Sequence, residues 1–145
     1  MGLNASLYLG AKNPNLSKIF NNVETDRGLF RKATFYDISE PSFNLRLNVM
    51  PKERMPEHFA GFQGYVTGLN GDADMTQLTL KLIPEIQCVL GVLTEAEPEE
   101  TPEVWEALTE IAAKFDGIIF AYDSIFLPNS TPILGPMVQV ANEED

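Results

Sequence analysis

The sequence predicts one α+β domain over residues 1–145, with a mainly antiparallel sheet and three helices packed on one side of it. Short runs alternate between apolar and polar residues, which is typical of strands with one buried face. Other segments begin at a proline and carry apolar residues three or four positions apart, which is typical of amphipathic helices. A chain of 145 residues has the usual size of one domain, and no linker is long enough to divide it.

The first two elements are a strand and a helix. Residues 3–9 place leucine and alanine on one side and mostly polar residues on the other, which predicts a half-buried strand. Asn13-Pro14 then supplies a capping residue and a proline suited to the first turn of a helix. Apolar residues follow at positions 16, 19, 20 and 23. This spacing predicts one buried helix face.

A pair of strands and a glycine-rich helix are predicted next. Residues 32–38 and 43–50 alternate in hydropathy, and a turn that contains Pro41 separates them. A weaker helical pattern covers residues 56–69. It carries three glycines on one side, at Gly61, Gly64 and Gly68. Because glycine is costly inside a helix, we expect these three to form a smooth face that lets a backbone or a ligand come close.

The second half of the chain predicts five further elements. They are strands over 76–82 and 85–94, a helix that begins at Thr101-Pro102, a buried strand over 117–122, and a hairpin over 124–127 and 132–134. Trp105 lies on the predicted apolar face of the helix. The full order is β-α-β-β-α-β-β-α-β-β, and its first six elements, residues 3–82, match a ferredoxin-like unit. The acidic end, 139–145, is expected to fray.

Charge is distributed unevenly along the chain. Ten basic residues stand against 21 acidic ones, for a net charge of -11. Residues 1–55 carry a net charge of +3, whereas residues 56–145 carry -14. The acidic part would repel phosphate groups, which argues against nucleic acids and anionic membranes as partners. The imbalance favours a basic protein partner.

The densest acidic run is the first candidate site. It comprises Glu95, Glu97, Glu99, Glu100 and Glu103. Acidic residues at a helix start are favoured by the helix dipole, but the first two lie ahead of the helix. We therefore predict that the run recognises a basic partner, with a solvated linker as the alternative. A basic cluster at Arg27, Arg31 and Lys32 is a further candidate anion site, or simply a solvated turn.

Two Tyr-Asp pairs form the second candidate site. Tyr36-Asp37 and Tyr122-Asp123 each end an apolar strand. Paired carboxylates can perform acid–base chemistry or hold a divalent cation, so a cleft lined by both pairs would suit an enzyme or a small-ligand-binding protein. The alternative is that each aspartate begins a turn.

The composition gives little support for a metal site, a cofactor or a Cys–His catalytic pair. One cysteine, Cys88, and one histidine, His58, exclude a cysteine-rich zinc site and paired-histidine motifs. A reduced, cytoplasmic compartment is expected, because the sequence starts without the pattern of a secretory signal. No cofactor or metal is predicted. As a catalytic pair, Cys88 and His58 are disfavoured, since Cys88 falls inside an apolar strand.

Residues 101–124, TPEVWEALTEIAAKFDGIIFAYDS, form a capped helix that leads into a buried strand. This run resembles small bacterial proteins, some of which act as immunity proteins against toxins. The resemblance implies a cytoplasmic protein that binds another protein. Together with the charge, it favours a non-enzymatic interaction protein that uses an acidic surface. The alternative is an enzyme or small-ligand-binding protein with an Asp/Tyr-lined cleft.

Overall fold

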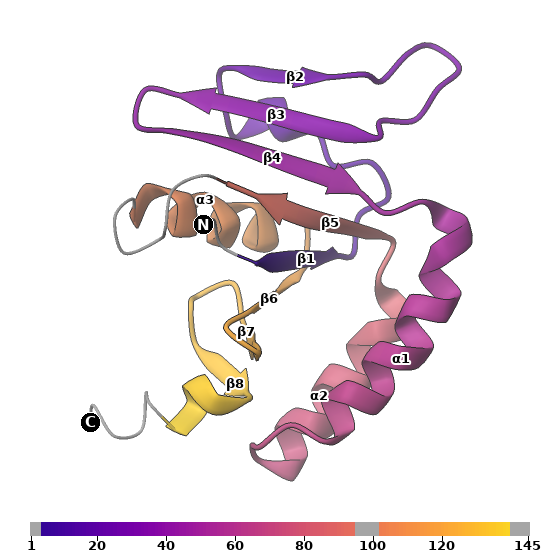
Figure 1. Cartoon of the computed structure of the whole chain (residues 1–145), viewed down its shortest axis with the longest axis vertical. Helices are drawn as coiled ribbons and strands as arrows, with labels where there is room; N and C mark the ends of the chain where they lie inside the picture. The colour runs from indigo at the N-terminus through magenta and orange to yellow at the C-terminus, as the bar shows by residue number, and fades with distance from the viewer. Residues whose placement is uncertain (1–3, 95–101, 140–145) are drawn as a thin grey trace.

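The computed structural model describes residues 4–94 and 102–139 and confirms the α+β class (Figure 1). One antiparallel sheet has the strand order β2-β3-β4-β5-β1-β6-β7-β8. Its strands are β1 (Ala5–Leu9), β2 (Val23–Thr25), β3 (Phe35–Glu40), β4 (Phe43–Val49), β5 (Cys88–Leu93), β6 (Ile118–Ala121), β7 (Ser124–Phe126) and β8 (Pro132–Leu134). The helices are α1 (Met55–Thr67), α2 (Ala73–Leu82) and α3 (Pro102–Lys114), with short 3-10 turns η1 (Leu16–Lys18), η2 (Lys52–Arg54) and η3 (Ile83–Glu85).

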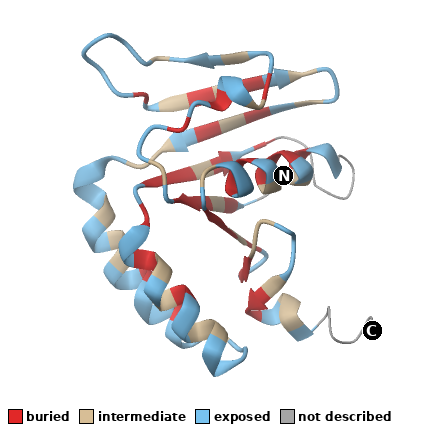
Figure 2. Ribbon diagram, turned by 180° about the vertical axis from the view of Figure 1, so that it is seen from behind, coloured by how far each residue is buried: buried red, intermediate tan, exposed pale blue. Residues whose placement is uncertain are grey.

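Helices cover both faces of the sheet, which corrects the prediction that they pack on one side. α3 and η1 pack on one face, over a cluster that includes Leu7 and Ile119. α1 and α2 pack on the other face, over a cluster that includes Tyr8 and Ile118. Neighbouring residues of a strand point to opposite faces, so β1 and β6 are buried on both sides. Figure 2 shows this burial in the central strands, with the outer sides of α1 and α2 exposed.

The helix expected after Asn13-Pro14 is wrong. The chain makes only the turn η1, in which the amide of Phe20 donates to the carbonyl of Leu16 at 3.0 Å. Both side chains enter the core. The chain then extends into β2, where Val23 pairs with Ile38. One tight turn is enough to bury the first apolar residues, so their helical spacing did not require a longer helix.

The strand expected over residues 76–82 is also wrong, because α2 occupies this segment. Asp72 caps the helix, and its carboxylate accepts a hydrogen bond from the amide of Asp74 at 2.9 Å. Thr79 is fully buried and donates to the carbonyl of Met75 at 2.9 Å. The alternation of leucine and polar residues over 76–82 therefore predicted the wrong type of element. With this helix, and with η1 in place of another, residues 3–82 do not form a ferredoxin-like unit.

The remaining elements agree with the sequence analysis. The strand pair over 32–38 and 43–50 appears as β3 and β4, with Ile38 opposite Leu45. The helix over 56–69 appears as α1, although its glycines have a different meaning. A methyl group built on Gly61 or Gly64 would meet nothing within 4 Å. Among the described residues, no backbone of another segment lies close to these two glycines, so the expected smooth packing face is not found there.

Candidate functional site

A large hollow lies at the end of the sheet where β1 and β4 end and β3 and β5 begin. Its volume is about 710 Å³, within the range of small-molecule sites. We call it the lysine-rimmed pocket. It is lined by Lys12, Asn13, Lys32, Ala33, Thr34, Tyr36, Val49, Met50, Pro51, Lys52, Glu53, Met55, Pro56, Phe59, Ile86, Gln87 and Cys88.

The inner part of this pocket is apolar and uncharged. Tyr36 and Cys88 are both buried and come from strands β3 and β5. Burial raises the pKa of the Cys88 thiol to about 11, so the sulfur stays protonated at neutral pH. Burial also raises the pKa of Tyr36, so its phenol stays neutral. Met55 and Phe59 of α1 complete this apolar wall.

The mouth of the pocket is cationic. Lys12, Lys32 and Lys52 line it, against a single carboxylate, Glu53. All four are exposed. A group of three ammonium ions is notable in a chain of net charge -11. The combination of an apolar interior and a positive mouth suits a ligand with an apolar body and an anionic end.

The structure does not bring the two Tyr-Asp pairs together. β3 and β6 are separated by β4, β5 and β1, which places them about 19 Å apart. Tyr122 and Asp123 form the exposed turn between β6 and β7, with φ of 54° and 57°. A single cleft lined by both pairs is therefore not formed.

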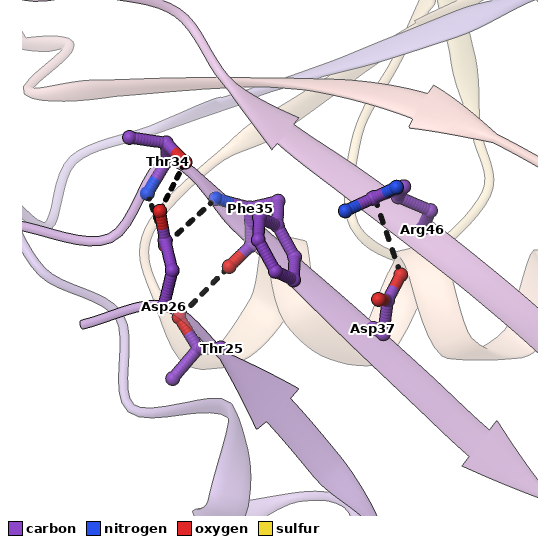
Figure 3. A network of polar contacts seen from close by, with 6 residues as sticks. All are labelled: Thr25, Asp26, Thr34, Phe35, Asp37 and Arg46. Atoms are coloured by element: carbon purple, nitrogen blue, oxygen red, sulfur yellow. Dashed lines mark hydrogen bonds and ion pairs between the residues drawn. The ribbon is translucent and has the colours of Figure 1, made fainter.

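Asp37 has a structural partner. Its carboxylate lies 3.3 Å from Nε of Arg46, the residue opposite it on β4 (Figure 3). The guanidinium of Arg46 also lies 4.2 Å from the ring centre of Phe35. Because side chains alternate along a strand, Asp37 points away from the pocket that Tyr36 lines. Of the four predicted residues, Tyr36 alone belongs to the pocket.

Most of the predicted acidic run, Glu95, Glu97, Glu99 and Glu100, lies outside the described residues. Glu103 is described and lies in the first turn of α3. It borders a second hollow of about 330 Å³, which we call the acid-rimmed hollow. Its lining is Ile19, Phe20, Asn21, Glu40, Pro41, Ser42, Phe43, Glu103, Glu106, Ala107 and Glu110. Four carboxylates thus surround a mixed apolar and polar surface beside the β3–β4 turn.

The basic cluster of the sequence lies at the tip of the long β2–β3 loop. Gly28 and Arg31 pair through their backbones, with N–O distances of 3.0 and 3.4 Å. Between them, Leu29 and Phe30 are 91% and 97% exposed. Figure 2 shows this loop as a projecting, exposed segment. We call residues 27–32 the hairpin tip.

Asp26 holds the base of this tip. Its carboxylate accepts hydrogen bonds from the hydroxyl of Thr34 and from the amides of Thr34 and Phe35, at 2.7 and 3.4 Å for the amides (Figure 3). The bond from the hydroxyl, followed by the one from the Thr34 amide, lowers the pKa of Asp26. The guanidinium of Arg31 donates to the carbonyl of Asp26 at 2.9 and 2.5 Å. Hydrogen bonds of Asp26 therefore connect the two strands that lead into and out of the tip.

His58 is engaged away from Cys88. Its Nε2 lies 2.9 Å from the hydroxyl of Tyr8, and its ring stacks on Phe62 at 6.0 Å. Burial lowers the pKa of His58. Cys88 lines the pocket, whereas His58 does not. Among the described residues, no three His, Cys, Asp or Glu side chains are grouped so that they could hold a metal ion. No helix in those ranges is long and apolar enough to cross a membrane.

Comparison of the chain with protein-family models, with curated proteins and with solved structures finds no match. The resemblance of residues 101–124 to small bacterial proteins stays a prediction.

Proposed function

We propose that this protein binds a small molecule that joins an apolar body to an anionic group, in the lysine-rimmed pocket. The pocket itself carries the proposal, because its apolar interior opens through three lysines. This proposal is a form of the small-ligand-binding alternative from the sequence. Of the four Tyr and Asp residues predicted for that site, it keeps Tyr36. Binding rather than catalysis is favoured, since the neutral Cys88 thiol has no base beside it among the lining residues.

The lining residues indicate which part of the ligand each part of the pocket would contact. The apolar body would displace water from the wall formed by Met50, Met55 and Phe59, where burial contributes about 25 cal/mol for each Å² of apolar surface. The anionic group would stay at the mouth near the ammonium groups of Lys12, Lys32 and Lys52. Exposed ion pairs contribute about 0.2–1 kcal/mol each. The wall would therefore supply most of the affinity and the lysines the preference for an anion.

Titrations with octanoate and with octanol test the proposal, because the two probes differ mainly in charge. We expect octanoate to bind more tightly, with shifts in the methyl NMR signals of Met50 and Met55. A K12Q/K32Q/K52Q variant should bind octanoate roughly tenfold more weakly, as about 1.4 kcal/mol of lost attraction implies. Its affinity for octanol should be unchanged.

The other lysines of the chain provide the matched control. A K18Q/K81Q/K114Q variant has the same change in net charge at residues outside the pocket. It should bind octanoate like the unmodified protein. Equal losses in both triple variants, or methyl shifts confined to methionines outside the pocket, would contradict the proposal.

The acid-rimmed hollow supports a second candidate, an interaction protein with an acidic surface. Glu103, Glu106 and Glu110 rise from one side of α3, and Glu40 faces them from the β3–β4 turn. A hollow that combines some apolar side chains with a rim of carboxylates suits a partner that presents apolar side chains flanked by basic ones. A role like that of immunity proteins would use such a surface and stays a prediction.

A further inference from the structure

The hairpin tip is the most unusual surface of the described chain. Leu29 and Phe30 have the two highest exposures among its large apolar side chains. Arg27, Arg31 and Lys32 flank them. The bonds of Asp26 join the two ends of the loop, and the backbone pairing of Gly28 with Arg31 closes the turn that presents the two apolar side chains. Exposed apolar residues on a braced loop are typical of an interaction site.

The acid-rimmed hollow has the complementary chemistry. Its lining includes the apolar side chains of Ile19 and Phe43, and its rim carries four glutamates. The tip thus offers two apolar side chains and three positive charges, while the hollow offers apolar side chains and four negative charges. By contrast, the lysine-rimmed pocket would repel the basic tip.

The tip cannot reach the hollow of its own chain. The two lie at opposite ends of β3, with the β2–β3 loop before Phe35 and the β3–β4 turn after Glu40 (Figure 1). A strand of this length spans about 17–20 Å. An encounter between the two surfaces therefore requires two molecules.

We propose that the hairpin tip of one copy docks into the acid-rimmed hollow of a second copy. This inference deepens the second candidate function by naming its partner. It does not depend on ligand binding in the lysine-rimmed pocket, although Lys32 belongs to both surfaces. The contact is heterologous, because a different surface of each molecule takes part, so it can propagate from copy to copy. Two side chains and a few ion pairs make a small interface, typical of a weak, reversible association. The net charge of -11 opposes it at long range, but physiological salt screens that repulsion beyond about 8 Å.

Sedimentation velocity over concentrations from about 10 μM to about 1 mM tests the proposal. The unmodified protein should show a weight-average mass that rises with concentration at about 0.15 M salt, where the long-range repulsion is screened, and that rises less at about 0.5 M salt, where the ion pairs of the contact are weakened as well. An L29S/F30S variant has a disabled tip and an intact hollow, and an E106R/E110R variant has the reverse. Each should remain monomeric. Both should keep the melting temperature of the unmodified protein within a few degrees, since the changed side chains are exposed.

Mixing the two variants gives the decisive result. The intact tip of E106R/E110R should dock into the intact hollow of L29S/F30S, and the complex should stop at a 1:1 dimer. A monomeric unmodified protein at the highest concentration would overturn the proposal, as would self-association of L29S/F30S or the absence of dimers in the mixture. Binding of monomers to phosphatidylserine vesicles, lost in L29S/F30S, would overturn it in favour of a lipid surface.

Discussion

Replacing Gly61 and Gly64 by alanine should stabilise the protein. Both lie in the interior of α1, both are exposed, and a methyl group at either position would meet nothing within 4 Å. Neither has a positive φ, so alanine fits the existing backbone. Glycine in a helix interior is about 0.8–1 kcal/mol less favourable than alanine. The G61A/G64A double variant should therefore gain about 1.5–2 kcal/mol.

Urea denaturation followed by far-UV circular dichroism measures this gain. The midpoint should rise while the m-value stays constant, and the melting temperature should rise by about 3–8 °C for a domain of this size. Ligand binding should not change, because neither glycine lines the lysine-rimmed pocket. Loss of stability in G61A/G64A would refute the reasoning and would mean that another segment covers this side of α1.

Gly117 provides the contrasting control. A methyl group there would lie 2.6 Å from both the carbonyl oxygen of Tyr8 and Cδ2 of Leu9. Because the first of these atoms belongs to the backbone of β1, the strand or the loop after α3 must move. We expect G117A to lose stability while G61A/G64A gains it. The pair of outcomes separates glycines that packing requires from those that it only tolerates.

Two further predictions concern His58 and Trp105. Burial lowers the pKa of His58, so the unfolded chain binds more protons between that pKa and about 6.5. The melting temperature should fall as pH drops from about 7.5 to 5.5, and this fall should flatten in H58Q; an unchanged slope in H58Q would contradict the assignment. The Trp105 ring is only half-buried, packs edge-on against Phe126 at 5.0 Å, and donates from Nε1 to Ser130 at 3.0 Å. W105A should lose about 2–3 kcal/mol and W105F about 1 kcal/mol in urea titrations, whereas a loss below about 0.5 kcal/mol in W105A would show that the ring contributes little packing.

Sequence patterns located most strands because strand burial leaves a local signal. In β4 the side chains of Leu45 and Leu47 are buried and those of their neighbours are not, so alternation alone identified the strand. The same pattern failed over residues 76–82. There, the decisive residue was Asp72, whose side chain caps the first turn of α2. A capping residue marks the start of a helix directly, whereas alternating hydropathy does not rule a helix out.

The lysine-rimmed pocket could not be predicted, because its lining comes from four separate segments, residues 12–13, 32–36, 49–59 and 86–88. One signal was nevertheless present in the sequence. Lys32 precedes β3 and Lys52 follows β4, and antiparallel pairing places Phe35 opposite Asn48. This register places the start of β3 beside the end of β4. The lysines that flank these two points, Lys32 and Lys52, therefore lie on the same side of the hairpin. Lys12, after β1, joins them only through the strand order β4-β5-β1, which no local pattern reveals.

The uneven charge of the sequence becomes a separation in space. The hairpin tip and the three lysines of the pocket lie at the end where β3 begins, and the acid-rimmed hollow lies at the end where β3 finishes. Glu40 illustrates why the sequence division at residue 55 misses this, since it belongs to the basic half of the chain but to the acidic end of the sheet. Opposite fields at the two ends would steer anions and cations to different sites. Binding of a small ligand and acceptance of a basic tip are therefore compatible in one molecule, because the pocket and the hollow lie at opposite ends of the sheet.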